Sequence, residues 1–470
     1  MLEPQTLQTP GDTDWFVQDR FGMFIHWGLY AMPARGEWVM MREETSRDAY
    51  LKKYFDRFDP DLYDPERWAD AAANAGMKYF VITTKHHDGF CLWDSKHTDY
   101  KATKTPYGRD LLRPMVDAFT GRGLRTGFYH SLLDWQHPQY IVDYKTHPER
   151  DALEAIEGIG TSAGAATEPK GGRYDGTDLN AGRDQSRYAA YLRDQVRELL
   201  TEFGDVAVMW FDFSFAGDDR YPRDDFRFNK GREAWESEKL YAMIRELMPG
   251  VILTDRLDLE LPLSGGDVKT PEQVQPKRWV TVEHEGKQVP VVWEACQTFS
   301  GSWGYHRDES SWRSVRQLVT TLIDCVSKGG NLLLNVGPTG RGEFDYRAIE
   351  RLEGIGRWMH HHNRSIYGCT QAPDEFPCPT DCRLTYNPTT KRLYIHLLNY
   401  PYNFLQLDAP AYKERVEYAQ LLHDASELST ELPPFFKHQL DPKGEKLVLT
   451  LPKTEPAGIE VPVIELFLKD

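Results

Sequence analysis

Short apolar runs that alternate with amphipathic segments place the strongest constraint on the fold of this chain. Continuous apolar runs are typical of strands buried on both faces of a parallel sheet, and the segments between them have the apolar period of helices. About eight such units predict a (β/α)8 barrel of the TIM type, distorted because the spacing between units is irregular. The runs cover residues 21–28, 78–86, 125–131, 206–213, 250–256, 289–296 and 329–338.

The pattern breaks in two places. Residues 154–184 are rich in Gly, Ala and small polar residues, which predicts a long loop after the third strand, at the face of the barrel where loops carry function. After about residue 363, short alternating strand candidates punctuated by Pro, Gly and Asp predict a small antiparallel β-sandwich. We therefore expect a barrel domain over residues 1–362 and a β-sandwich over residues 363–470.

Charge and composition exclude several classes of partner. The formal net charge is -16 and the basic residues form no dense run, so binding to nucleic acid is not expected. No apolar window approaches the length of a membrane span, and the N-terminus lacks the basic and apolar regions of a signal peptide. A cytoplasmic protein without membrane contact is predicted, with secretion and homo-oligomer formation left open.

Polar and aromatic side chains lie at the carboxyl ends of six of the apolar runs, or just after them. In a barrel of this type catalytic residues come from the carboxyl ends of several strands, so these positions predict a shared site. No His or Cys spacing fits a tetrahedral metal site, and no metal ligand is predicted. The residues are His26 and Trp27; His86, His87 and Asp88; Tyr129, His130 and Asp134; Trp210 and Asp212; Asp255 and Arg256; and Trp293 and Glu294.

The adjacent pair His86 and His87 predicts where the second strand ends. Neighbouring residues of a strand point to opposite faces, so both imidazoles can reach one ligand only where the strand has ended. We therefore predict that the strand stops at about His86 and that the Asp88–Gly89 step is a turn.

These strand ends belong to longer motifs that resemble a known family. FGMFIHWGLY, the pair Glu37 and Trp38, YFVITTKHHDGFCLWDS, YHSLLDW, MWFD, TDR followed by KTPEQ, WEACQTFSGSWGY and GGNLLLNVGPTGRGEF are similar to consecutive signatures of glycoside hydrolase family 29, the retaining α-L-fucosidases. The resemblance runs from about residue 15 to 365. It implies an exo-acting enzyme that removes terminal α-linked L-fucose from oligosaccharides or glycoconjugates through a covalent fucosyl-enzyme, without a cofactor.

The resemblance also implies roles for two carboxyl groups. Asp212, in Trp-Phe-Asp at the end of the fourth strand, corresponds to the nucleophile. The general acid and base corresponds to Glu272 in Lys-Thr-Pro-Glu-Gln, with Glu294 as the second candidate and with Glu37 and Asp267 after it. Because a general acid begins protonated near neutral pH, we expect it in a partly desolvated place.

A third group of residues is implied to bind the sugar. Imidazoles and carboxylates can bond ring hydroxyls, and aromatic rings can cover the apolar face and the methyl group of a deoxy sugar. The set is His26, Glu37, Trp38, His86, His87, Tyr129, His130, Trp210, Arg256 and Glu294, with Phe299 and Trp303 beside the pocket.

Three other functions stay open at this point. A hydrolase of a related sugar such as an α-L-galactoside would need more room at C6. A catalytically inactive fucose-binding protein would keep the pocket, although Asp212, Glu272 and Glu294 are all present. The many histidines leave a metal-dependent hydrolase as the third.

Overall fold

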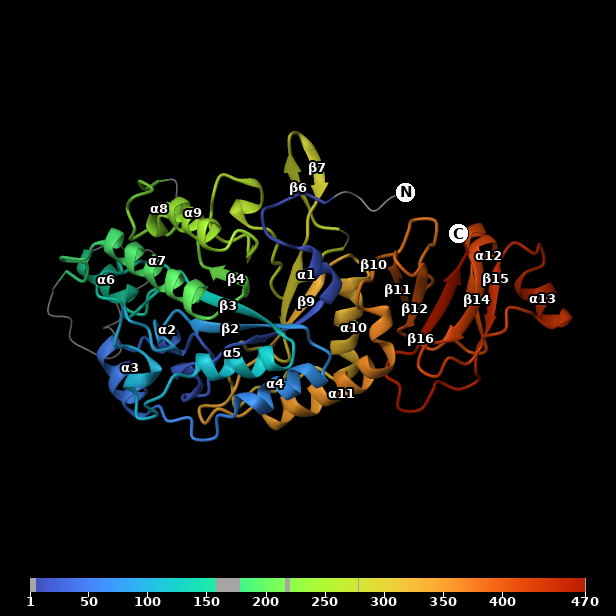
Figure 1. The fold of residues 1–470 in the computed structure, drawn as a ribbon, viewed down its shortest axis with the longest axis horizontal. Coiled ribbons are helices and arrows are strands. Elements are labelled where there is room, and N and C mark those ends of the chain that lie inside the picture. Colours follow the sequence, from blue (N-terminus) through green and yellow to red (C-terminus); the bar gives the residue numbers. More distant parts are fainter. Residues whose placement is uncertain (1–5, 158–177, 216–219, 278, 470) are drawn as a thin grey trace.

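A curled sheet of seven parallel strands forms the centre of the molecule (Figure 1). In this computed structural model, which describes residues 6–157, 178–215, 220–277 and 279–469, the strand order is β5-β4-β3-β2-β1-β9-β8. Each predicted apolar run supplies one strand, so the predicted barrel-like parallel fold is confirmed. The strands are β1 (Phe21–Ile25), β2 (Tyr79–Lys85), β3 (Arg125–Ser131), β4 (Val206–Asp212), β5 (Ile252–Leu253), β8 (Glu294–Thr298) and β9 (Asn331–Val336).

An irregular extended segment, residues 267–272, fills the gap between β5 and β8. The backbone N–H of Asp267 donates to Leu253 O over 2.7 Å, and the N–H of Lys269 donates to Val292 O over 2.9 Å. Further along, isolated parallel bridges join Lys269 to Trp293 and Glu272 to Cys296. This closing segment completes the barrel without forming a regular strand, which is the distortion that the uneven spacing predicts.

The sixth predicted run is only partly right. Residues 287–290 form β7 (Lys287–Pro290), which pairs antiparallel with β6 (Thr281–His284) in a projecting hairpin (Figure 1). The barrel strand β8 therefore begins at Glu294, five residues after the predicted start at 289. The hairpin and the strand follow each other without a polar break, so the apolar pattern does not separate them.

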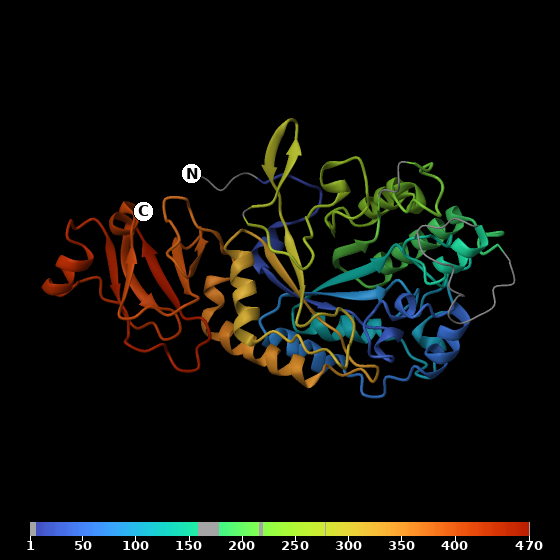
Figure 2. The same cartoon turned by 180° about the vertical axis from the view of Figure 1, so that it is seen from behind.

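Helices cover the outside of the curled sheet (Figures 1 and 2). Their starts follow ordinary capping chemistry: Asp64 caps α4 ahead of a proline, and Ser314 with Gln317 forms a capping box on α10. The larger helices are α4 (Pro65–Asn74), α5 (Leu112–Gly121), α7 (Gln185–Glu202), α9 (Ser237–Leu247), α10 (Val315–Val326) and α11 (Tyr346–His362). Shorter ones are α1 (Asp14–Asp19), α2 (Val39–Arg42), α3 (Arg47–Lys53), α6 (Arg150–Glu157) and α8 (Arg232–Trp235). Within the described residues, no helix is long and apolar enough to cross a membrane.

The long loop predicted over residues 154–184 is shorter than expected at its start. Residues 154–157 belong to α6, which Ala152 and Leu153 anchor by burial. Residues 158–177 lie outside the described part of the chain, and residues 178–184 lead by turns into α7.

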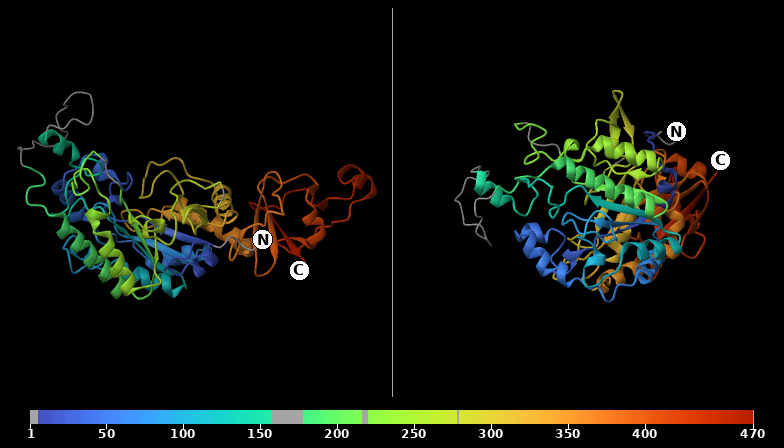
Figure 3. Two further views of the ribbon diagram at one scale, coloured as in Figure 1. Left: turned by 90° about the horizontal axis from the view of Figure 1, so that it is seen from above. Right: turned by 60° about the vertical axis from the view of Figure 1, so that its left-hand side comes forward.

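Antiparallel sheets follow α11, as the sequence predicts, and lie at one end of the elongated molecule, beside the barrel (Figure 3). A five-stranded sheet has the order β10-β11-β12-β16-β14, and β13 pairs with β15. Apolar contacts and polar bonds tie this region to the barrel, among them Trp358 Nε1 donating to Val461 O over 3.0 Å. The elements are β10 (Thr370–Gln371), β11 (Cys382–Asn387), β12 (Arg392–Leu397), β13 (Phe404–Leu407), α12 (Pro410–Arg415), β14 (Val416–Leu421), α13 (Pro434–Leu440), β15 (Leu447–Thr450) and β16 (Val463–Leu468).

Candidate active site

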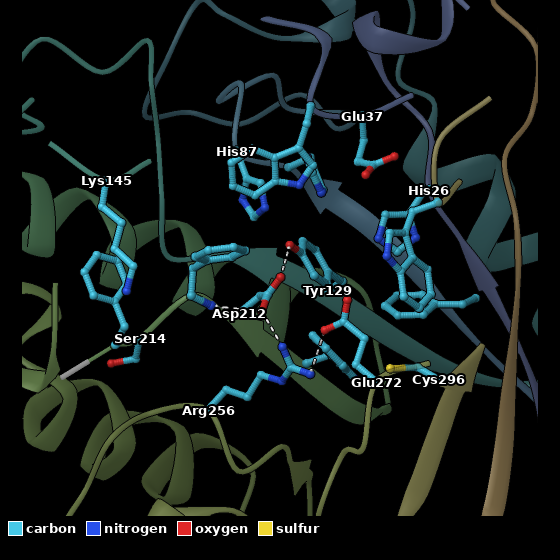
Figure 4. Close-up of a pocket in the computed structure, with 17 residues that line it drawn as sticks. His26, Glu37, His87, Tyr129, Lys145, Asp212, Ser214, Arg256, Glu272 and Cys296 are labelled. Carbon is cyan, nitrogen blue, oxygen red and sulfur yellow. Dashed lines mark hydrogen bonds and ion pairs between the residues drawn. The ribbon is translucent and has the colours of Figure 1, made fainter. Parts of the chain in front are cut away.

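A pocket of about 320 Å³ opens at the carboxyl ends of the barrel strands (Figure 4). This volume lies at the small end of the range for ligand pockets, roughly 300 to 1,000 Å³. Polar and aromatic side chains from most of the predicted strand ends meet there. The lining residues are Phe24, His26, Glu37, Trp38, His86, His87, Tyr129, Lys145, Trp210, Asp212, Phe213, Ser214, Phe215, Arg256, Glu272, Cys296 and Trp303.

Asp212 lies at the centre of this pocket as the last residue of β4. The hydroxyl of Tyr129 donates to its Oδ2 over 2.9 Å, and Nη1 of Arg256 donates to its Oδ1 over 2.7 Å. The backbone N–H of Phe213 also donates to Oδ1, over 2.9 Å. These donors hold the carboxylate in one orientation, with its side chain 13% exposed.

Glu272 lies on the closing segment, at the rim of the pocket. Nη2 of Arg256 donates to its Oε2 over 3.2 Å, so one guanidinium joins Glu272 to Asp212 (Figure 4). The Glu272 side chain is 44% exposed. The partly desolvated place expected for the acid and base is therefore not found at Glu272, because the irregular closing segment carries this residue to the rim.

Glu37 is the buried carboxyl group of the pocket. Burial raises the pKa of Glu37, against the opposing effect of the N–H of Gly304, which donates to Oε2 over 2.8 Å. Arg256 stays cationic: burial disfavours its charge, but the nearby Asp212, Cys296 and Glu272 raise its pKa. Its guanidinium also lies over the ring of Trp210, 4.5 Å from the centroid.

His86 and His87 lie just after the end of strand β2, as the sequence predicts. Strand β2 ends at Lys85, and the N–H of Gly89 donates to His86 O over 3.0 Å, which closes a turn over residues 86–89. Both rings face the pocket with centroids 3.9 Å apart. The prediction that the strand stops at about His86 and turns at Asp88–Gly89 is confirmed.

The pocket imidazoles are neutral. Burial lowers the pKa of His26 and of His87 to about 3 and lowers that of His86 as well. Nδ1 of His26 lies 2.6 Å from Oδ1 of Asn335, whose amide nitrogen donates to Trp303 O, so Nδ1 carries the proton and Nε2 is left as an acceptor. Nδ1 of His86 is buried without a partner among the described residues.

Two predicted sugar-binding residues lie outside the pocket. His130 follows Tyr129 on β3 and points to the opposite face, where its Nδ1 lies 3.0 Å from Oγ1 of Thr84. Glu294 is the first residue of β8, so it lies at the amino end of the barrel, where the hydroxyl of Tyr79 donates to it. Burial raises the pKa of Glu294 to about 8. The structure contradicts the assignment of both residues to the pocket.

Asp267, an alternative acid and base, is also at the amino end. It accepts bonds from the N–H groups of Gly11 and Leu253 and pairs with Arg245 over 2.6 Å. The carboxyl groups that line the pocket are therefore Glu37, Asp212 and Glu272.

A sequence model of the family described as alpha-L-fucosidase matches residues 3–364. The chain belongs to the alpha-L-fucosidase family. The tissue alpha-L-fucosidase of Bos taurus is 26% identical over 95% of this chain and 86% of its own length. Plasma alpha-L-fucosidase of Homo sapiens is 27% identical over 82% of this chain and 76% of its own.

Solved structures of the alpha-L-fucosidase family share the whole fold. Alpha-L-fucosidase isoenzyme 1 from Paenibacillus thiaminolyticus superposes with a TM-score of 0.82 at 40% identity, over 97% of this chain and 99% of that one. A family 29 enzyme from Bacteroides thetaiotaomicron, solved as a covalent intermediate trapped with 2-fluoro-fucosyl fluoride, gives a TM-score of 0.75 at 28% identity, over 100% of this chain and 98% of that one.

The alpha-L-fucosidase pocket contains three residues that the sequence did not single out, Phe24, Lys145 and Cys296. Phe24 and Cys296 could have been found from strand alternation, since each lies two residues from a predicted inward position. Lys145 comes from the loop after β3, for which no motif gave a signal. In the described residues, no group of three His, Cys, Asp or Glu side chains is placed to hold a metal ion.

Backbone strain marks both central carboxyl groups of this alpha-L-fucosidase fold. Phe213 and Gln273, which follow Asp212 and Glu272, have φ angles of 68° and 55°. A non-glycine residue in the left-handed region costs about 1 to 2 kcal/mol, and such residues gather at functional sites. The left-handed conformation of Phe213 and Gln273 turns the chain directly after each carboxyl group.

Proposed function

We propose that this protein is an exo-acting, retaining α-L-fucosidase that removes terminal α-linked L-fucose from oligosaccharides or glycoconjugates. The observation that carries the proposal is the bridge of Arg256 between Asp212 and Glu272 at the mouth of a pocket for one sugar. Two carboxyl groups bonded to one guanidinium lie close together, as in retaining glycosidases, where the separation is about 5 to 5.5 Å. The names of the similar proteins support the same activity.

The first chemical step forms a covalent intermediate. An Asp212 oxygen attacks the anomeric carbon while the bond from that carbon to the leaving-group oxygen breaks, and Glu272 gives its proton to that oxygen. Tyr129 and Arg256 hold Asp212 for the attack. The trapped intermediate of the Bacteroides thetaiotaomicron relative supports this step.

The second step releases fucose. Glu272, now a carboxylate, takes a proton from a water molecule whose oxygen attacks the anomeric carbon, and the bond to Asp212 breaks. Two inversions at one carbon give overall retention. A bound sugar would cover Glu272, which lies at the rim of the pocket, and shield this proton transfer from bulk water.

The neutral imidazoles of His26, His86 and His87 suit an uncharged sugar. Nε2 of His26 can accept a hydrogen bond from a sugar hydroxyl, and His86 lines the pocket beside it. Tyr129, Trp210 and Phe24 supply apolar surface for the methyl group of a deoxy sugar. The division into a catalytic domain, residues 1–362, and a β-sandwich domain, residues 363–470, is part of the same proposal.

The test is hydrolysis of 4-nitrophenyl α-L-fucoside by the wild type and by Asp212→Ala, Glu272→Ala and Glu37→Gln, with and without azide. We expect Asp212→Ala to lose about 10³-fold or more in kcat, because the covalent route is gone. Glu272→Ala should regain turnover with azide, which attacks the fucosyl-enzyme and gives α-L-fucosyl azide.

The configuration of the azide product separates the roles. A β-fucosyl azide from Asp212→Ala would confirm a missing nucleophile, because azide then attacks the substrate directly with one inversion. Normal turnover by Asp212→Ala would disprove the nucleophile assignment, and azide rescue of Glu37→Gln in place of Glu272→Ala would move the acid and base to Glu37. Glu294→Gln, at the amino end of the barrel, is the matched control and should keep its turnover.

A further inference from the structure

A second hollow borders the sugar pocket and shares three of its walls. It is lined by Glu37, Trp38, Met41, Arg42, Gln273, Ser300, Gly301, Trp303, Ser311 and Arg313. Of these, Glu37, Trp38 and Trp303 also line the pocket around Asp212. The two hollows therefore form one continuous surface, divided by two tryptophan rings. We call the second one the arginine groove.

The arginine groove lies on the leaving-group side of the site, an assignment that rests on the proposed function. A general acid reaches the oxygen of the leaving group, so the leaving group must lie beyond Glu272. The next residue, Gln273, lines the groove and has a left-handed backbone conformation with φ 55°. Its N–H donates to Cys296 O over 3.0 Å and its side chain donates to Thr298 over 3.0 Å, which fixes this conformation.

The charge of the groove differs from that of the chain. In a protein of net charge -16, the groove holds two guanidinium groups; the charge of Arg42 acts on the carboxyl group of Glu37, which lines the same groove, whereas Arg313 forms no ion pair within the described residues. Nη1 of Arg313 donates to Oε1 of Gln297 over 2.8 Å, a neutral partner. The carboxyl of Glu37 accepts a bond from Gly304.

A half-buried cation without an anionic partner is costly, and burial lowers the pKa of Arg313 for this reason. Guanidinium groups bind sulfate and carboxylate groups through paired N–H donors. We propose that the arginine groove binds the saccharide that fucose leaves, and that Arg313 and Arg42 select a saccharide bearing a sulfate ester or a carboxylate close to the fucosyl bond. The aromatic faces of Trp38 and Trp303 cover the ring of that sugar.

The test compares one fucosylated oligosaccharide in three forms: neutral, sulfated, and carrying a carboxylate sugar next to the fucosylated residue. For the wild type, kcat/KM should be about tenfold higher for at least one anionic form, and this preference should shrink as salt rises from about 20 to 500 mM. Arg313→Gln and Arg42→Gln should each lower the ratio of anionic to neutral kcat/KM by about three- to tenfold. The anionic form that responds identifies the group that is bound.

Arg67→Gln is the matched control, because Arg67 is an exposed arginine on α4 and should leave the ratio unchanged. Equal kcat/KM for all three forms, or equal losses on all three in Arg313→Gln, would overturn the selection of anions. Hydrolysis of 4-nitrophenyl α-L-fucoside separates the two proposals. If the wild type cleaves the aryl fucoside without preferring anionic saccharides, the groove proposal alone fails; if it cleaves no fucoside, the proposed function fails.

Discussion

Both ends of the barrel have a carboxyl group bonded to a tyrosine and a carboxyl group bonded to an arginine, but only the carboxyl end has these groups in a pocket. At the carboxyl end, Asp212 receives both a tyrosine hydroxyl and an arginine. At the amino end the two partners are divided, since Tyr79 donates to Glu294 and Arg245 pairs with Asp267. The comparison shows that a Tyr–carboxyl or Arg–carboxyl pair does not by itself make an active site.

What separates the ends is access and charge. Asp267 is buried and forms its ion pair with Arg245. Glu294 has no cation among its bonded partners, and burial raises its pKa to about 8. Asp212 and Glu272 share one cation and face a cavity. A substrate can therefore reach one set of carboxyl groups, while the other serves the fold.

The largest expected difference comes from removing the arginine at each end. Arg245→Met leaves Asp267 buried and unpaired, and we expect a loss of about 3 to 5 kcal/mol in the free energy of unfolding with kcat per folded molecule unchanged. Arg256→Met should lower kcat/KM for an aryl fucoside by about 10²- to 10³-fold with a smaller loss of stability. Urea unfolding and steady-state kinetics on both variants measure this, and a reversed pattern would remove the distinction between the ends.

A second difference concerns pH. The pKa of Glu294 is raised from 4.5 to about 8 in the folded protein, so the folded state keeps a proton that the unfolded state releases. Stability from this group is complete below pH 4.5 and is lost as the pH rises to about 8. Glu294→Gln should remove that loss, which is on the order of 5 kcal/mol for a pKa raised from 4.5 to about 8, at about 1.4 kcal/mol per pKa unit. Unfolding of both proteins at pH 5 and pH 9 measures it; parallel stability changes would mean that Glu294 does not titrate in this range.

The smallest difference is between the two tyrosines. Tyr129→Phe removes one donor to Asp212, and we expect kcat/KM to fall about ten- to a hundredfold, because a hydrogen bond to a charged group contributes about 1.5 to 3 kcal/mol. Tyr79→Phe removes the donor to Glu294 and should reduce stability by about 1 to 2 kcal/mol without an effect on kcat. Kinetics and thermal unfolding of the pair test this, and a tenfold loss of kcat in Tyr79→Phe would contradict it.

Much of the site could be predicted because strand ends are visible in the sequence. Apolar runs that stop at polar residues gave His26, His86, His87, Tyr129, Trp210, Asp212 and Arg256, all of which line the pocket. The turn at Asp88–Gly89 followed from side-chain alternation alone.

The two predicted residues outside the pocket have different causes. The apolar run from 289 does not show which end of its strand Glu294 occupies; the hairpin of β6 and β7 uses residues 281–290, so Glu294 starts its strand. His130 follows Tyr129 on the same strand and therefore points to the opposite face. The position of Lys145 in the pocket and the left-handed backbone of Phe213 depend on tertiary packing, which sequence patterns do not predict.

The closing segment has a consequence for how the protein opens locally. Strand β4, which ends in Asp212, is paired with β3 along its length, whereas residues 268–272 are joined to their neighbours by single bridges. Backbone hydrogens in poorly paired segments exchange with solvent through small openings, while those in central strands exchange only when the whole domain unfolds. We therefore expect the segment that carries Glu272 to open at a lower free energy than β4, which carries Asp212. Mild denaturant would interrupt proton transfer while the nucleophile is still in place.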